Sequence, residues 1–234
     1  MLLKSASLAL LAAASISVVC VQANQQEGSA IRLMRQLYVQ DQRDRGVLLS
    51  DAGDALPAAV ASNPPVSLPD AELNKNDAAR RNKVRELLRA GQVTTAQDFH
   101  DAAFIFQHGE MPEDYLFAHI LAVEAVVKGD SRSKWISAAT LDRYLQAIGQ
   151  AQVFGTQYSD RDFAFVIRHK DNPAAMKAHR HEDGMTQQPY DDALMPDVLR
   201  LDFCVPSRAQ QKVNLKEFEA GRYPSGILPP GCTR

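Results

Sequence analysis

The sequence predicts a mainly α-helical fold, either an antiparallel bundle of helices or a short solenoid-like stack of them. Two observations predict it. Apolar residues recur over several segments at the three- and four-residue spacing of a helix face. Glycines then interrupt these segments at almost even intervals, at Gly91, Gly109, Gly129 and Gly149. Short helices that are joined by tight glycine turns pack as antiparallel neighbours, so we expect one compact core.

Residues 1–23 have the pattern of a secretory signal peptide. Lys4 gives a short positive beginning, residues 8–19 are apolar, and small or moderate residues lead up to Ala23. We expect cleavage after Ala23 and export to the periplasm or the extracellular space. Cleavage is favoured over a lipid anchor at Cys20, because valine precedes that cysteine where Gly, Ala or Ser is preferred. The apolar run is too short for a stable membrane span, and none is expected after it.

Residues 24–50 are expected to hold a polar leader and an N-terminal helix that ends at Gly46, where glycine favours a helix stop. Within that helix, Asp41 and Arg45 are four residues apart, the spacing of an ion pair on a helix surface. Residues 51–75 contain four prolines and little apolar periodicity. They are expected to form a Pro-rich linker on the surface.

Residues 76–222 are expected to form a helical core with a C-terminal appendage, in one domain with residues 24–50. Thr95 and Asp98 have the spacing of a capping box, and Pro112 suits the first turn of a helix. Four helices are expected, from Asp77 to Ala90, from Thr95 to His108, from Pro112 to Gly129 and from Arg132 to Ile148.

The C-terminal third is expected to contain a small β-hairpin. Residues 152–158 and 163–168 flank a polar turn, and the second run alternates apolar and other residues as a strand does. A polar loop is expected over residues 169–186. A short helix over 196–203 and a last helix, capped by Ser207 and ending at Ala220, are expected after it.

Removal of the signal peptide would leave two cysteines, Cys204 and Cys232, an even number in an oxidising compartment. Residues 223–234 form a Pro/Gly-rich tail with few apolar side chains to bury. We therefore expect a Cys204–Cys232 disulfide, rather than two free thiols, that ties the tail to the body. In the chain-entropy model a loop of this size adds about 3–4 kcal/mol of stability.

Histidines and acids near residue 100 could carry chemistry. Asp101 and His108 are nearly two helical turns apart, so a carboxylate there could orient an imidazole. His100, His108 and His119 could instead meet around a metal. Their spacing matches no metal-binding motif, so we expect structural roles, no metal site and no cofactor.

A second polar run lies further along the chain. Asp142 and Arg143 sit between apolar residues of one predicted helix, and residues 152–157 end in Gly155, Thr156 and Gln157. Glycine permits a close approach of the backbone, while the hydroxyl and amide can saturate buried helix ends or bind a small polar ligand. We favour the structural role, since buried polar groups usually satisfy one another.

Several of these motifs together resemble a family of bacterial domains of unknown function, over residues 34–205. The motifs are Asp41-Gln42-x-x-Arg45, Gln107-His108, Asp142-Arg143, Gln152-x-Phe154-Gly155-Thr156-Gln157, and Asp197 followed by Arg200. This sequence departs from the family in Phe154, where tyrosine is usual, and in Ala151, where proline is common. The resemblance implies no activity. It implies that the polar residues of these motifs, namely Asp41, Arg45, Gln107, His108, Asp142, Arg143 and Gln157, meet in space.

The first functional hypothesis is an exported helical binding or protein-interaction module, whose partner is an unidentified protein or a small polar ligand. The alternative is a hydrolase-like enzyme that activates a water, because no serine or cysteine nucleophile is evident. There His108 would be the general base, Asp101 or Asp142 would orient it, and Arg143 with Gln157 would steady a developing negative charge. Ligand-binding roles are expected for Asp41, Arg45, Gln107 and Gln157. The formal net charge of −2 makes a nucleic-acid surface unexpected.

Overall fold

The computed structural model describes residues 33–47, 49, 67–179, 181 and 184–232. The predicted signal peptide, Ala23, Cys20 and most of the predicted linker lie outside these residues. The mainly α-helical fold is confirmed: the described residues form helices that pack on one another and no sheet, and strand-like pairing is confined to isolated bridges such as Gln152–Tyr190 and Ser159–Thr186. Within the described part of the chain, no helix has both the length and the apolar character needed to cross a membrane.

The helices follow one another closely along the chain. The described part of the N-terminal helix covers residues 33–44. The others are α2 (Asp70–Arg89), α3 (Ala96–Phe106), α4 (Pro112–Val127), α5 (Ser133–Ala147), α6 (Phe163–Arg168), α7 (Pro173–Ala178), α8 (Asp197–Asp202) and α9 (Arg208–Glu219).

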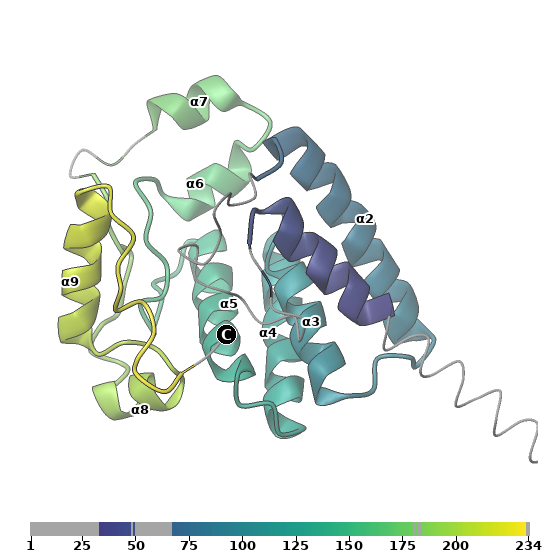
Figure 1. The fold of residues 1–234 in the computed structure, drawn as a ribbon. Coiled ribbons are helices and arrows are strands. Elements are labelled where there is room, and N and C mark those ends of the chain that lie inside the picture. The colour runs from purple at the N-terminus through teal and green to yellow at the C-terminus, as the bar shows by residue number, and fades with distance from the viewer. Residues whose placement is uncertain (1–32, 48, 50–66, 180, 182–183, 233–234) are drawn as a thin grey trace, which may run out of the picture.

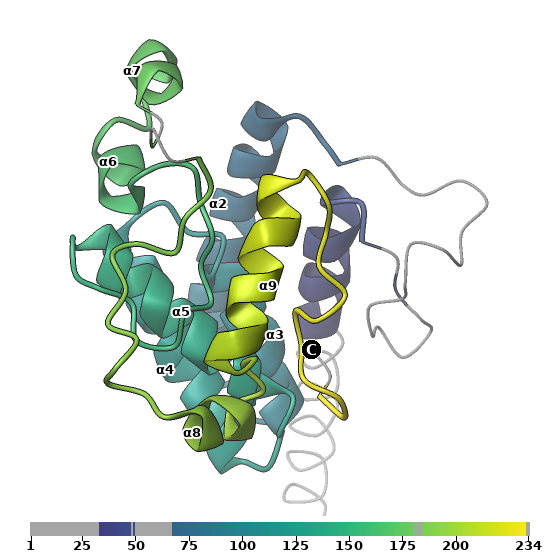
Figure 2. The same ribbon diagram turned by 90° about the vertical axis from the view of Figure 1, so that its left-hand side faces the viewer.

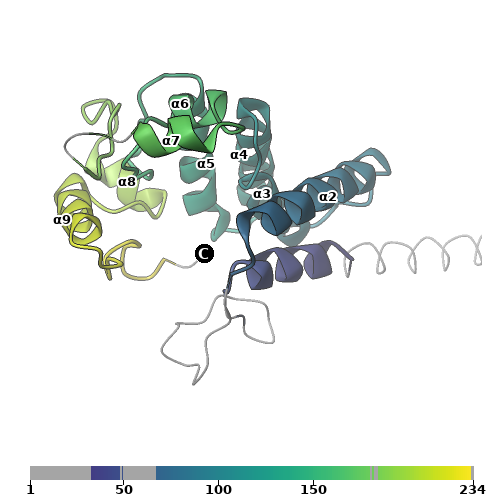
Figure 3. The ribbon, with the colours of Figure 1, turned by 90° about the horizontal axis from the view of Figure 1, so that it is seen from above.

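Helices α3, α4 and α5 pack against one another in chain order and form the centre of the molecule (Figure 1). The N-terminal helix and α2 lie side by side and cross this group obliquely (Figures 1 and 3). Helices α8 and α9 lie on the other side of α5, and α6 and α7 lie at one end (Figures 1 and 2).

Buried apolar side chains form two clusters. The larger cluster lies between the N-terminal helix and α2–α5, and includes Met34, Leu37, Val84, Ile105, Phe106, Leu121 and Ile136. The smaller cluster contains Ala138, Phe154 and Val205, so it attaches the C-terminal segment to α5. Burial of an apolar side chain of this size contributes about 1.5–3 kcal/mol, which makes the larger cluster the main source of stability.

Local signals account for several helix ends. The side chain of Thr95 accepts a hydrogen bond from the backbone N–H of Asp98, and the Asp98 side chain accepts one from the N–H of Thr95, which is the predicted capping box. Pro112 occupies the first turn of α4, as predicted. Gly109 has a different role from the other turn glycines, because a Cβ atom there would collide with the side chain of Asp114.

Helix α2 begins at Asp70, so the end of the predicted linker, residues 70–75, is helical. The prolines had favoured an extended segment up to Lys75. Pro69 instead precedes the first turn, and Asp70 and Glu72 lie in that turn, where carboxylates complement the positive end of the helix dipole.

The predicted β-hairpin is wrong. Residues 163–168 form α6, because the side chain of Asp162 caps the helix by accepting a hydrogen bond from the N–H of Phe165 at 3.0 Å. A six-residue apolar run fits both periods, and this local cap decides between them. Gln152 and Ser159 pair by isolated bridges with Tyr190 and Thr186 instead. The predicted loop over 169–186 also contains a short helix, α7, which is capped by Asn172.

Cys204 and Cys232 form the predicted disulfide. The segment from Tyr223 to Cys232, which we call the tail (residues 223–232), runs back beside α9 in Figures 1 and 2.

Candidate functional site

Asp41 is fully buried, although its spacing from Arg45 had predicted a surface ion pair. Its Oδ1 accepts a hydrogen bond from Arg45 Nη1 at 2.9 Å and lies 3.2 Å from Nδ1 of His108. Its Oδ2 accepts a hydrogen bond from the Gln42 amide at 2.8 Å. A buried carboxylate needs several such partners, because removal from water is costly. Asp41 therefore joins the N-terminal helix to the end of α3.

The network around Asp41 continues into α2 through residues that the sequence alone did not single out. Arg45 also bonds Asp77, and Arg80 bonds Asp77 at 2.7 Å and Asp44 at 2.6 Å. Asp77 and Arg80 are three residues apart on α2, and this spacing is the sequence feature that could have predicted their ion pair. Alternating charges thus connect the N-terminal helix with α2.

The pKa values of Asp41 and His108 shift in the same direction. Burial raises the pKa of Asp41, but His108, Arg45 and Arg80 outweigh it and hold the pKa below its ordinary value. Burial lowers the pKa of His108, and Arg45 and Arg143 add to this against the opposing effect of Asp41. An ionised carboxylate can only accept hydrogen bonds, so Nδ1–H of His108 donates to Asp41.

Arg143 caps the carboxyl end of α3. Its Nη1 donates to the backbone carbonyl of Gln107 at 2.7 Å, while Arg81 donates to the carbonyl of His108 at 2.8 Å. The hydroxyl of Tyr115 donates to the next carbonyl, that of Gly109, at 2.7 Å. The last carbonyls of a helix have no partner within the helix, and cations complement its negative end. Gln107 thus takes part through its backbone carbonyl, and Arg143 stabilises the end of α3.

Asp142 organises the turn that follows α5. Its Oδ1 accepts hydrogen bonds from the N–H groups of Val153 and Phe154, at 2.8 and 2.9 Å. Its Oδ2 accepts two from Thr156, one from the N–H at 2.9 Å and one from the hydroxyl at 2.8 Å. Burial raises the pKa of Asp142, against the lowering effect of these hydrogen bonds. All four go to the turn, so Asp142 does not orient His108.

Gln157 connects this turn to Arg143 and α5. Its Oε1 accepts a hydrogen bond from Arg143 Nε at 3.3 Å, and its Nε2 donates to the Ala139 carbonyl at 3.1 Å and to the Thr156 hydroxyl at 2.9 Å. The amide is therefore saturated by the protein itself.

The motif residues were expected to meet at one place, but they form separate groups with structural roles. Asp41, Arg45 and His108 meet at the N-terminal helix, and Arg143 links the end of α3 to Gln157. Asp101, the other residue proposed to orient His108, bonds Arg35 and Gln97 instead. These contacts support helix ends and helix packing.

The three histidines considered for a metal have separate partners. Nδ1 of His100 lies 2.8 Å from the Ser133 hydroxyl, and Nδ1 of His119 lies 2.8 Å from the Ser137 carbonyl. His108 faces Asp41. In the part of the chain that the structure describes, no group of three or more His, Cys, Asp or Glu side chains could hold a metal ion.

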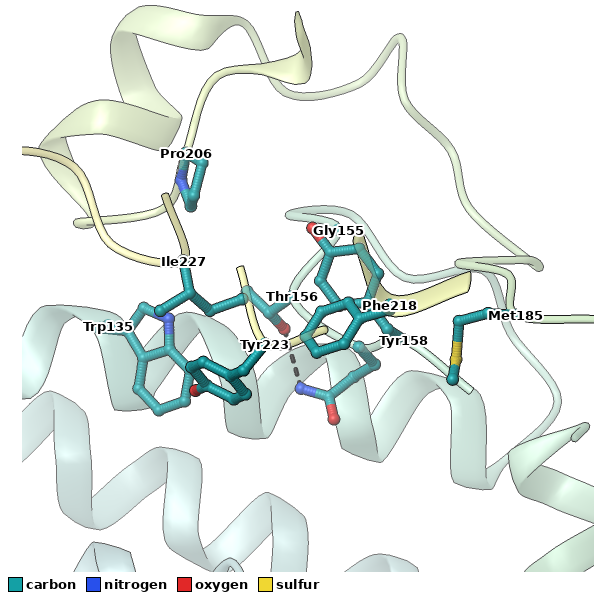
Figure 4. Close-up of a pocket in the computed structure, with 10 residues that line it drawn as sticks. Trp135, Gly155, Thr156, Tyr158, Met185, Pro206, Phe218, Tyr223 and Ile227 are labelled. Carbon is teal, nitrogen blue, oxygen red and sulfur yellow. Dashed lines mark hydrogen bonds between the residues drawn. The ribbon is translucent and has the colours of Figure 1, made fainter. Parts of the chain in front are cut away.

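A pocket of about 280 Å³ lies between the turn after α5, the end of α9 and the tail (Figure 4). None of its lining residues is charged, and most are apolar or aromatic. They are Trp135, Gly155, Thr156, Gln157, Tyr158, Met185, Pro206, Phe218, Tyr223 and Ile227. The sequence indicated only the Gly155–Gln157 part of this site. The remaining residues come from distant segments that tertiary structure brings together.

Rings form one side of the pocket. The ring centroids of Tyr158 and Phe218 are 4.9 Å apart, and Tyr223 meets Phe218 edge-on at 5.9 Å. Trp135 also lines the pocket, and its ring is drawn beside that of Tyr223 in the view of Figure 4. Aromatic groups of a ligand can stack on such rings.

The polar groups in the pocket are largely occupied by the protein. The Thr156 hydroxyl donates to Asp142 and accepts from Gln157, a contact that is dashed in Figure 4. Burial raises the pKa of Tyr158 to about 12, against the hydrogen bond with Asn214 that lowers it. The pocket floor therefore offers apolar contact more than free hydrogen-bonding groups.

Comparison with protein-family models, with curated proteins and with solved structures finds no match. The resemblance to a bacterial family of domains of unknown function thus stays an expectation from the motifs.

Proposed function

We propose that this protein is an exported binding protein that holds an uncharged, ring-bearing apolar ligand in the pocket beside Trp135. The observation that carries the proposal is the chemistry of the lining: no residue in it is charged, and four are aromatic. Ligand sites are typically apolar cavities with a few polar groups. Export is supported by the signal-like residues 1–23 and by the Cys204–Cys232 disulfide, since disulfides persist in oxidising compartments.

The size of the pocket suggests the size of the ligand. An apolar cavity of about 150 Å³ in another protein holds benzene. A pocket of about 280 Å³ therefore has room for two fused rings, and because it is open to solvent on one side, a third ring can extend toward the opening. The expected small polar ligand fits less well, because Thr156 and Gln157 already bond other groups of the protein.

The hydrolase-like alternative has less support. Asp142 forms its hydrogen bonds with the turn after α5, and Arg143 forms its own with Gln157 and with the end of α3. The three residues named for catalysis, His108, Asp142 and Arg143, thus stabilise separate helix junctions, and none of them lines the pocket.

Trp135 makes the proposal directly testable, because it is the single tryptophan of the sequence and lines the pocket. The probe is N-phenyl-1-naphthylamine, an uncharged compound with fused rings, with glucose as the polar comparison. We expect the naphthylamine to quench Trp135 emission saturably with one site per chain, and glucose to leave it unchanged.

Tyr223→Ala removes a lining ring that is 71% exposed, so it should leave the fold intact. Loss of one stacking partner should weaken binding up to about tenfold. Val127→Ala is the matched control, because Val127 is 75% exposed and lies outside the pocket. Equal affinity of both variants, or quenching that never saturates, would sink the proposal.

A further inference from the structure

The tail supplies part of the pocket wall but is weakly attached to the body. Tyr223 and Ile227 line the pocket. Among the described residues, a single hydrogen bond connects residues 223–232 to the rest of the chain, from the Asn214 amide to the Gly226 carbonyl at 2.9 Å. Pro224 is the one buried residue of this stretch, while residues 226–229 and 232 are half-buried. Apart from this hydrogen bond and the Tyr223–Phe218 ring contact, few noncovalent contacts hold the wall, and segments with few such contacts open locally at low cost.

The disulfide supplies the missing attachment, and it does so at the rim of the pocket. Cys232 lies at the far end of the tail and is bonded to Cys204, two positions after the last residue of α8. Pro206, two residues after Cys204, is itself a lining residue. The covalent bond thus ties the far end of the tail beside the part of the pocket that Pro206 forms.

We propose that the tail is a removable wall of the pocket, and that the Cys204–Cys232 disulfide controls ligand binding by holding this wall in place. This inference rests on the proposed function, because it concerns the regulation of the same site. In the oxidised protein Tyr223 and Ile227 close the pocket, and the ligand is held against Phe218. In the reduced protein the tail leaves and the affinity falls.

The chemical step is a thiol–disulfide exchange with a dithiol. The Cys204–Cys232 bond takes up two electrons and two protons and becomes two thiols, while the dithiol becomes a disulfide. Because binding and oxidation favour the same state of the tail, the coupling must be reciprocal. A bound ligand therefore shifts the disulfide equilibrium toward the oxidised form by the same factor by which reduction weakens ligand binding.

The experiment uses the full chain after signal removal, with dithiothreitol as the dithiol. N-phenyl-1-naphthylamine is titrated against Trp135 emission in the oxidised and the reduced protein, and in the Cys204→Ser, Cys232→Ser double variant. We expect affinity at least about tenfold weaker in the reduced protein and in the double variant, with an unchanged helical circular dichroism spectrum. Equal affinity in oxidised and reduced protein of native helix content would overturn the inference.

A second measurement needs no ligand. Quenching of Trp135 by iodide should increase on reduction, because departure of Tyr223 and Ile227 exposes the pocket. If the oxidised protein fails to bind the probe, the proposed function is wrong, yet iodide quenching still decides the inference about the tail: unchanged quenching overturns it.

A third variant guards against loss of folding on reduction. Tyr223→Ala combined with Ile227→Ala keeps the disulfide but removes the wall side chains. This variant should bind the probe as weakly as reduced protein does, and dithiothreitol should weaken it no further. A full additional loss on reduction would show that the disulfide acts on the pocket by another route, and would contradict the proposal.

Discussion

The imidazole of His108 and the carboxylate of Asp41 face each other at 3.2 Å, although the two residues are 67 positions apart in the sequence. This pair fastens the end of α3 to the N-terminal helix. The same carboxylate receives Arg45 and Gln42, so it is the centre of a network in which each member satisfies a buried neighbour.

Replacement of His108 should change stability and leave ligand binding intact. His108→Ala deprives the buried Asp41 carboxylate of one partner, and we expect a loss of about 1–3 kcal/mol in the free energy of unfolding. His108→Gln can still donate a hydrogen bond, so its loss should be smaller. Urea unfolding measures both. If folded His108→Gln bound N-phenyl-1-naphthylamine more than about tenfold more weakly, the separation of this network from the pocket would be refuted.

Asp101 should make stability fall as the pH rises toward neutrality. Burial raises the pKa of Asp101 to about 7, against the lowering effects of Arg35 and Gln97. Its Oδ2 has no hydrogen-bond partner among the described residues. Because the folded pKa exceeds the ordinary value of 3.8, this group's contribution is fully present below about pH 4 and is lost as the pH rises through about 7.

The variant Asp101→Asn isolates this effect, since it cannot ionise. Urea unfolding at about pH 5 and about pH 8 measures how much stability each protein loses as the pH rises. We expect this loss to be smaller in Asp101→Asn than in the unaltered protein by a few kcal/mol. An identical pH dependence in both proteins would show that Asp101 ionises freely in the fold.

Replacement of Asp142 should damage both the turn and the pocket. Each carboxylate oxygen of Asp142 accepts two hydrogen bonds, and in Asp142→Asn one of these oxygens becomes an NH2 group that cannot accept them. We therefore expect the free energy of unfolding to fall by roughly 3 kcal/mol or more. Because Thr156 lines the pocket, binding of the naphthylamine should also weaken. Asp202→Asn is the control, as that carboxylate is 72% exposed and should change stability by less than about 0.5 kcal/mol. Native stability of Asp142→Asn would remove the turn-organising role.

Gly155 and Gly149 offer a matched test of close approach. Both have left-handed backbone angles, with φ of 79° and 77°. A Cβ at Gly155 would lie 2.5 Å from the Tyr190 hydroxyl, whereas one at Gly149 would meet nothing within 4 Å. Alanine at either position carries backbone strain of about 1 kcal/mol, so the collision should add at least about 1 kcal/mol at Gly155 only. Thermal or urea unfolding of the two variants compares them, and equal losses would mean that Tyr190 moves aside freely.

Sequence alone was sufficient for features that depend on near neighbours. The Thr95–Asp98 capping box and the first-turn proline at Pro112 follow from spacings of a few residues, since their partners lie within one helical turn. The even number of cysteines in the predicted mature chain was enough for the Cys204–Cys232 pair.

Tertiary structure decided what depends on distant partners. The local Asp162 cap selects the helix for residues 163–168, and tertiary structure adds the packing of Phe163 near Tyr115. Nothing in the local pattern tells whether His108 bonds Asp41 or Asp142. The pocket likewise exists only where the turn at Thr156 meets the tail. These contacts span long stretches of chain, and their energy is gained only after the backbone has folded, so no local period records them.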